Sequence, residues 1–227
     1  MKHDISNIID DIISGMDSTI ALEYDVVTFK WMTCDSKWAR IGKIITNSLG
    51  GEFRITDMEP NAWIEAILVK GSGGIEPIMN LSEPFAITGT KMVANLEWTK
   101  ANPNVMEKTP IIWLLETIRF VESGRDKPIQ FESDLRLFFL DETNVAQYMT
   151  KDHRNNVVRP MNQMIDEFVR TINSNRNFKR ILDTERITFS RFGVERDNGV
   201  FQNVLDANLS GVELRFTLTK FKENCIC

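Results

Sequence analysis

The sequence predicts an α+β protein, with a mainly antiparallel sheet packed against helices and a β-hairpin insertion. Three stretches indicate this class. Residues 111–115 form an apolar run, Ile-Ile-Trp-Leu-Leu, which is typical of a strand buried on both faces. Residues 134–140 alternate as a strand does, and residues 157–173 carry apolar side chains at helical spacing. The composition, 42% hydrophobic and 26% charged over 227 residues, is ordinary for a globular chain, so we expect one α+β domain over residues 1–227.

The chain begins with a segment of helical periodicity, residues 4–16. Its apolar positions form one stripe with a 3.6-residue period: Ile5, Ile8, Ile9, Ile12, Ile13 and Met16. Such a stripe packs either on the core of its own domain or on a neighbouring subunit. Internal packing is the commoner use of a helical stripe, and both interpretations stay open here.

Two further elements are expected before residue 51. Residues 21–32 are rich in Val, Thr, Phe and Tyr, which favour a strand. Asp35 or Ser36 can cap a second helix that ends at Gly50. The apolar positions of that helix would be Trp38, Ile41, Ile44 and Ile45.

Residues 51–106 differ in character from their surroundings. Short strand-like pieces alternate there with proline and glycine, a pattern that indicates hairpins and exposed loops. Residues 71–74, Gly-Ser-Gly-Gly, lack the following Lys-Ser/Thr of a phosphate-binding loop, so we interpret them as a hairpin tip. The whole block is predicted to be a β-rich insertion that reaches away from the core.

The second half of the chain is expected to close the core. The strand over residues 134–140 carries apolar side chains at both parities, so both of its faces should be covered. Asn155 or Asn156 is expected to cap the long helix, with Pro160 in its first turn. The inward stripe of that helix is Val157, Met161, Met164 or Ile165, Phe168 and Ile172.

Two closing strands complete the prediction. Residues 185–194 form the first, and the Arg-Asp-Asn-Gly sequence at residues 196–199 is a strong turn signal. In the last strand, residues 205–221, the apolar positions change parity at Ser210-Gly211. Because one extra residue reverses the inward face of a strand, this change predicts a β-bulge.

Composition argues against several kinds of chemistry. The net charge of −5 disfavours general nucleic-acid binding, and three cysteines (Cys34, Cys225, Cys227) with two histidines are too few for a zinc site. The cysteines are expected to be free thiols, and neither a signal peptide nor a membrane span is expected. Asp152-His153-Arg154 is interpreted as a solvated loop, because adjacent residues do not converge as a catalytic triad does. We therefore expect no enzyme activity, cofactor or metal.

The expected interaction surfaces are an apolar helix face and two aromatic residues. Trp63 and Trp98 lie within the predicted insertion, where little core is available to bury them. Together with Ile5, Ile9 and Ile12 of the first helix, they are the residues that we expect at an interface between subunits.

From residue 109 onward the chain carries a series of motifs in a fixed order. They are Thr-Pro-Ile-Ile-Trp-Leu-Leu-Glu, Asp-Leu-Arg-Leu-Phe-Phe-Leu-Asp-Glu-Thr, the helix from Arg-Pro-Met to Phe168, Arg-Ile-Thr-Phe-Ser-Arg-Phe-Gly, and Leu-Asp-Ala-Asn-Leu-Ser-Gly-Val-Glu-Leu-Arg-Phe-Thr-Leu. This order resembles the tail-terminator or tail-completion proteins of tailed bacteriophages, especially crAss-like and other phages that infect Bacteroidetes. With residues 26–49 the resemblance covers about two thirds of the chain, and residues 51–106 depart from it.

The resemblance implies a structural virion protein that is assembled in the host cytoplasm. Such proteins form a homo-oligomeric ring of six or twelve copies in the phage neck or upper tail, between other neck and tail proteins and the portal side. Genomic DNA would pass through without sequence-specific binding, and an acidic lumen would keep it from adhering. The alternatives are a small-molecule or peptide-binding module, with a pocket near the glycine-rich block, and an enzyme whose residues converge only in three dimensions.

Overall fold

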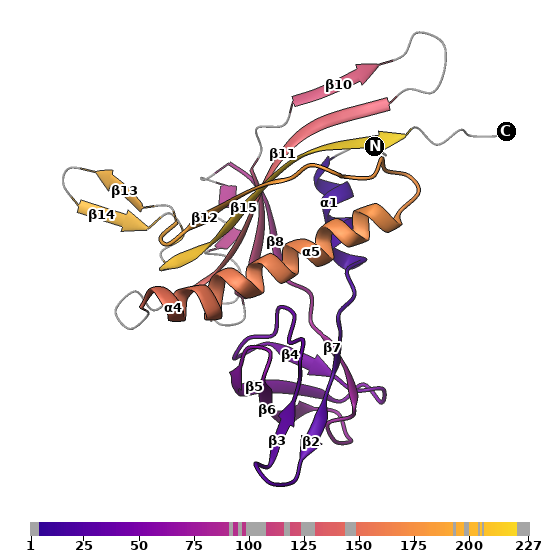
Figure 1. Cartoon of the computed structure of the whole chain (residues 1–227), viewed down its shortest axis with the longest axis vertical. Helices are drawn as coiled ribbons and strands as arrows, with labels where there is room; N and C mark the ends of the chain where they lie inside the picture. The colour runs from indigo at the N-terminus through magenta and orange to yellow at the C-terminus, as the bar shows by residue number, and fades with distance from the viewer. Residues whose placement is uncertain are drawn as a thin grey trace, which may run out of the picture.

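The chain folds into two sheets dominated by antiparallel pairing, with a long helix, which confirms the α+β class (Figure 1). The computed structural model describes residues 5–90, 93–94, 97–98, 108–115, 119–123, 130–143, 149–192, 194–197, 200–203, 205 and 207–221. The first half contains α1 (Ile5–Ser14), β1 (Thr19–Ala21), β2 (Glu23–Asp25), β3 (Lys30–Met32), β4 (Ile44–Thr46), β5 (Glu52–Glu59), β6 (Trp63–Lys70), β7 (Ile78–Leu81) and β8 (Phe85–Gly89). The second half contains β9 (Ile111–Leu115), β10 (Arg119–Ser123), β11 (Gln130–Glu142), α4 (Thr150–His153), η1 (Arg154–Val158), α5 (Arg159–Ser174), β12 (Glu185–Phe189), β13 (Val194–Asp197), β14 (Val200–Asn203) and β15 (Leu209–Phe221).

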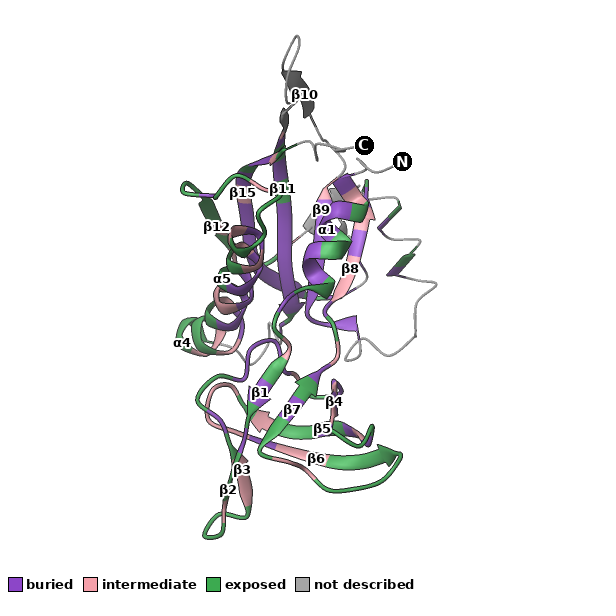
Figure 2. Ribbon diagram, turned by 90° about the vertical axis from the view of Figure 1, so that its right-hand side faces the viewer, coloured by how far each residue is buried: buried purple, intermediate pink, exposed green. Residues whose placement is uncertain are grey.

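The six-stranded sheet is built around β11. Its strand order is β12-β15-β11-β9-β8, with β10 paired to β11; β8 and β9 run parallel, and the other pairs are antiparallel. The β11 strand has apolar side chains on both faces, as the sequence predicts. Leu137 and Phe139 belong to the main core, while Phe138 and Leu140 belong to a second cluster on the opposite face with Trp113 of β9. Figure 2 shows β11 and β15 as the most continuously buried strands of the sheet.

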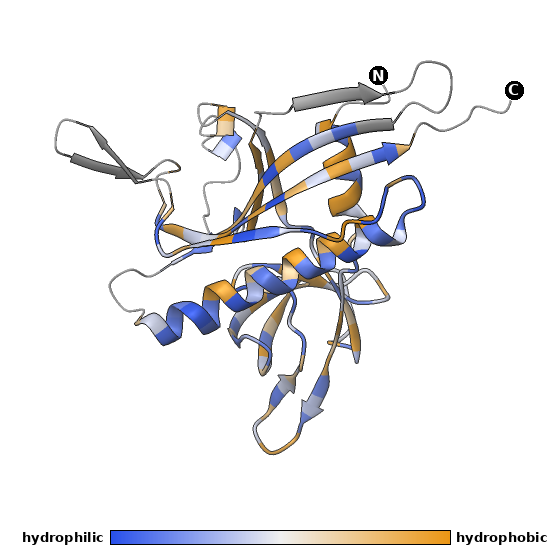
Figure 3. Ribbon diagram, turned by 45° about the horizontal axis from the view of Figure 1, so that its top comes forward, coloured by the Kyte–Doolittle hydropathy of each residue, from blue (hydrophilic) through white to orange (hydrophobic). Residues whose placement is uncertain are grey.

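Two helices cover one face of this sheet. The predicted stripe of α1 is entirely buried in the main core, as is the predicted stripe of the long helix. Figure 3 shows the amphipathic character of α5 as hydrophobic and hydrophilic colours that alternate along the helix. The periodicity of both segments therefore identified their buried faces correctly.

The long helix begins earlier than predicted. It runs without interruption from Thr150 through α4, the π-helical turn η1 and α5, so Asn155 and Asn156 do not cap it. Pro160 lies directly after the π turn. In a regular helix the amide of residue 160 would donate to the carbonyl of Asn156, but proline has no N–H. A widened turn is one way in which a helix accommodates such a residue, and Arg40 Nη2 approaches the Asn156 carbonyl at 3.5 Å.

The seven-stranded sheet contains residues 19–81 and has the order β1-β7-β4-β5-β6-β3-β2. The helix predicted from Asp35 or Ser36 is wrong, because this segment forms turns followed by β4. Lys37 (φ 48°) and Gly42 (φ 93°) have backbone angles that no α-helix allows. Trp38 is buried, and its Nε1 donates to the carbonyl of Ser82 at 2.9 Å. Its apolar spacing resembled a helix because a sheet core took Trp38 and Ile45 from two separate pieces of chain.

The boundaries of the two sheets differ from those of the predicted insertion. Strands on both sides of residue 51 build the seven-stranded sheet, whereas β8 pairs with β9 in the six-stranded sheet. Residues 51–106 thus contribute to both sheets. The main core also extends into both, since it includes Ile45 and Ile64 of the seven-stranded sheet and Leu137 of the six-stranded sheet.

The predicted bulge at Ser210-Gly211 is wrong. β15 pairs with β11 in an unbroken register from Gln130↔Phe221 to Glu142↔Leu209. Leu209 faces the second cluster and Val212 faces the main core, so the apolar residues change face although the strand does not slip. Glycine is required at position 211 because a Cβ there would lie 2.0 Å from the carbonyl oxygen of Phe139. The predicted turn at residues 196–199 is flanked by paired strands, β13 and β14, while Asn198 and Gly199 themselves lie outside the described residues.

Candidate functional site

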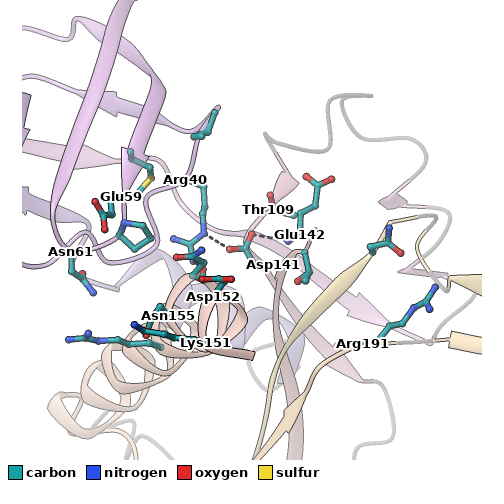
Figure 4. Close-up of a pocket in the computed structure, with 17 residues that line it drawn as sticks. Arg40, Glu59, Asn61, Thr109, Asp141, Glu142, Lys151, Asp152, Asn155 and Arg191 are labelled. Atoms are coloured by element: carbon teal, nitrogen blue, oxygen red, sulfur yellow. Dashed lines mark hydrogen bonds and ion pairs between the residues drawn. The ribbon is translucent and has the colours of Figure 1, made fainter. Parts of the chain in front are cut away.

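A cleft of about 1300 Å³ lies where the two sheets meet. Loops of the seven-stranded sheet form one wall, and the end of β11 with the beginning of the long helix forms the other (Figure 4). The lining residues are Arg40, Ile41, Met58, Glu59, Pro60, Asn61, Thr109, Asp141, Glu142, Thr143, Lys151, Asp152, Asn155, Asn156, Arg159, Arg191 and Asn208. The cleft is the largest concave feature of the described residues, so its chemistry decides what a small ligand could find here.

An ion pair between Arg40 and Asp141 crosses the cleft. Arg40 Nε donates to Asp141 Oδ2, and Figure 4 shows the guanidinium reaching from the seven-stranded sheet to the end of β11. Both side chains are largely buried, with exposed fractions of 12% and 5%. Arg40 Nη1 also donates to the carbonyl of Ala39 at 2.6 Å, and the backbone amide of Glu142 donates to Asp141 Oδ1 at 2.9 Å. These partners account for both charges, so the pair connects the two sheets instead of offering a free group to a ligand.

Asn61 forms a second connection across the same boundary. Its backbone is left-handed (φ 58°), a conformation that asparagine tolerates better than most residues. Its Oδ1 accepts from the backbone amide and hydroxyl of Ser36, and its Nδ2 donates to Gln163 Oε1 of α5 at 3.1 Å. The turn between β5 and β6 is thereby attached to the long helix.

A third connection lies beside α1. Lys37 Nζ donates to Asp17 Oδ2 at 2.7 Å, and the backbone amide of Asp17 donates to Glu167 Oε1 of α5 at 3.0 Å. The hydrogen bond from Lys37, together with that from Thr19, holds the pKa of Asp17 well below its usual range. Asp17 therefore carries a negative charge at every physiological pH.

The charges that face the cleft balance. Four basic residues (Arg40, Lys151, Arg159, Arg191) and four acidic ones (Glu59, Asp141, Glu142, Asp152) line it. A polyanion is therefore not attracted by a net positive potential. Burial raises the pKa of Glu142, and the carboxylate of Asp141 raises it further, which makes Glu142 the lining residue whose proton affinity is most altered.

The sequence Asp152-His153-Arg154 does not converge on the cleft. Asp152 Oδ2 accepts from the backbone amide of Met149, as a helix-capping carboxylate does. His153 Nε2 lies 2.8 Å from the hydroxyl of Ser210, which in turn contacts the hydroxyl of Thr143. Ser210 is fully buried, so this serine–histidine contact is closed to a substrate. Burial lowers the pKa of His153.

Metal ligands do not gather anywhere in the part of the chain that the structure describes: no group of three or more His, Cys, Asp or Glu side chains has the arrangement needed to hold an ion. Within the same residues, no helix combines the length and the apolar character needed to cross a membrane.

The residues predicted for a subunit interface are mostly internal. Ile5, Ile9 and Ile12 are 7%, 1% and 4% exposed in the main core, so they pack within the protomer and form no surface in this conformation. Trp98 is also buried, in the second cluster, and Lys108 Nζ donates to its carbonyl at 2.6 Å. Trp63 alone is partly exposed, with Lys30 Nζ 3.1 Å from the centre of its ring.

Exposed apolar side chains are concentrated instead on the seven-stranded sheet. Of the fifteen large hydrophobic residues exposed in the described part of the chain, eleven belong to residues 24–78. Three form the tip of the β2–β3 hairpin: Val26 (70% exposed), Val27 (81%) and Phe29 (75%). Three more, Ile67, Leu68 and Val69, lie in the second half of β6. Strand alternation does not reveal these residues, although an apolar Val-Val pair between turn residues was a signal that could have identified the hairpin tip.

Fold and cleft together define an α+β protein made of two sheets that share one core and are connected by a buried ion pair. Comparison of the chain with models of protein families, with curated proteins and with solved structures gives no match.

Proposed function

We propose that this protein is a structural component of a tailed-phage virion, which forms a homo-oligomeric ring in the neck or upper tail. The ring would connect the portal side to the tail and surround the DNA conduit. The motifs that resemble tail-terminator proteins support this proposal, because four of them contribute strands and a helix to one body: β9, β11, α5 and β15. The net charge of −5 suits a channel that DNA traverses without adhering.

The observation that carries the proposal is the exposed tip of the β2–β3 hairpin. Monomeric proteins rarely project clusters of large apolar side chains into water, and such clusters mark sites of protein–protein contact. The hairpin extends from the end of the molecule farthest from β10 (Figure 1), so it can reach a neighbouring copy without a clash from the rest of the chain. Phe29 also has a left-handed backbone (φ 59°), which is costly for a bulky residue and unexplained by any internal packing of its exposed side chain.

Mass photometry and electron microscopy of the purified protein test the ring directly. We expect closed particles of six or twelve copies. Phe29→Asp and Val27→Asp should lower the mass of the particles, because each places a charge in the apolar contact. Leu182→Asp, at a residue 79% exposed in the other half of the chain, is the matched control and should leave the mass unchanged. A protein that stays monomeric or dimeric at all concentrations would contradict the ring.

The cleft between the sheets favours a second candidate, a small-molecule or peptide-binding module. Its volume of about 1300 Å³ is sufficient for such a ligand. In that case a screen of small molecules should raise the melting temperature of a monomeric or dimeric protein. A substitution in the cleft wall, Asn155→Ala, should remove that response.

A further inference from the structure

Half of β6 has an unpaired edge. On one side β6 pairs with β5 along its whole length, from Trp63 to Lys70. On the other side it pairs with β3 only at Trp63 and Ile64. Within the described residues, no strand continues this second side, so the edge of residues 65–70 is open (Figure 2).

This open edge is apolar in its middle and charged at its two ends. Its sequence is Glu-Ala-Ile-Leu-Val-Lys, and Ile67, Leu68 and Val69 are 56%, 46% and 43% exposed. Soluble proteins usually protect an edge of this kind with inward charges, proline or a covering segment, because it can pair with another strand. Here the charges stand only at the ends, so the middle is left available.

The order of the charges makes the edge complementary to itself. When two copies of this strand run antiparallel in the register that pairs all six positions, Glu65 of each lies opposite Lys70 of the other. The apolar residues meet in the middle, where Ile67 lies opposite Leu68. We infer that β6 pairs edge to edge with β6 of a second copy of this chain, across a two-fold axis.

The ends of the strand fit this register. At one end β3 occupies the edge up to Ile64, and at the other end Gly71 (φ 80°) turns the chain away, so each copy offers the same six residues. Val69 is an extra residue against β5, where Glu52↔Lys70 is followed by Phe53↔Leu68, and the remainder of β6 keeps its spacing. The ion pairs of Lys70 with Glu52 and of Glu65 with Lys30 lie on the surface, where such pairs contribute little and leave room for a further contact.

The two-fold contact does not depend on the proposed ring. If the chain forms rings, β6 pairing joins two of them face to face and doubles the particle mass; if it does not, β6 pairing gives a dimer. The two ideas can therefore fail separately.

Charge reversal at the two ends tests the inference on the full chain. Glu65→Lys and Lys70→Glu each replace two attractive contacts by two repulsive ones, so each should weaken pairing roughly tenfold or more. The Glu65→Lys/Lys70→Glu double variant should pair as the wild type does. An equimolar mixture of the two single variants should also pair, because one chain then carries a lysine at both ends of the edge and the other carries a glutamate at both ends. Analytical ultracentrifugation measures all four.

Glu185→Lys and Lys179→Glu are matched controls, since both residues are exposed and belong to the other sheet and its neighbouring loop. They should leave the association unchanged, and far-UV circular dichroism should show every variant folded. The inference is overturned if the wild type shows no two-fold pairing, if the single reversals leave the mass unchanged, or if pairing does not return in the mixture.

Discussion

At the scale of single residues, the described polar groups of the interior are matched to partners. Glu213 of β15 is fully buried, and burial by itself would raise its pKa. Hydrogen bonds from Arg215 and Arg136 outweigh that effect and lower the pKa, so the carboxylate stays charged. His153 has the opposite balance, since its main contact is the neutral hydroxyl of Ser210 and burial lowers its pKa.

The lowered pKa of His153 predicts a dependence of stability on pH. In the unfolded chain His153 binds a proton at its ordinary pKa of 6.5, and in the folded chain it does so only at lower pH. The unfolded state therefore binds more protons in this window, so stability falls as the pH drops below about 6.5. In His153→Gln, which keeps a hydrogen-bonding side chain, we expect a shallower loss between pH 7 and pH 5.

Urea unfolding at several pH values provides the comparison. The carboxylates whose pKa is lowered, such as Asp17 and Glu213, titrate at lower pH in both proteins, so they cancel in the difference. Equal slopes for wild type and variant would show that His153 does not titrate differently on folding.

At the scale of elements, β15 shows how close two backbones can approach. Gly211 lies opposite Leu140 of β11, and the space for a side chain at position 211 is filled by the carbonyl of Phe139. A backbone atom of a central strand cannot move as the end of a flexible side chain can. The glycine is thus a packing requirement of the β11–β15 pair.

Gly211→Ala should therefore destabilise the protein by about 3 kcal/mol or more, because the added methyl group overpacks the sheet. Gly74→Ala is the matched control, since a Cβ there meets no atom within 4 Å. It should change the stability by less than about 1 kcal/mol. Thermal unfolding of both variants checks this, and equal melting temperatures would contradict the assigned role of Gly211.

At the scale of the whole molecule, the two sheets behave as one unit because they share a core. The main core contains side chains from α1, from the seven-stranded sheet and from the six-stranded sheet. Arg40 and Asn61 add polar contacts at the same boundary. We therefore expect one cooperative transition, with far-UV circular dichroism and tryptophan fluorescence changing together.

Arg40→Leu should reduce the free energy of unfolding by about 3–5 kcal/mol, because it leaves the buried carboxylate of Asp141 without its cation. Adding Asp141→Asn should recover part of that loss by removing the uncompensated charge. Arg186→Met breaks the more exposed pair with Asp166 and should cost less than about 1 kcal/mol. Equal losses for Arg40→Leu and Arg186→Met, measured by urea unfolding, would show that the buried pair does not hold the sheets together.

The sequence by itself determined the α+β class, the two amphipathic helices and the strands that are buried on both faces. These features depend on local periodicity, which is written in consecutive residues such as Ile111 to Leu115. The tertiary structure alone decided which strands share a sheet, where Trp38 is buried, and that Ile5, Ile9, Ile12 and Trp98 pack inside the protomer. It also decided the cleft, since Arg40 and Asp141 are 101 positions apart and no local pattern connects them. Burial and pairing are properties of distant segments brought together, so they become visible only once the chain has folded.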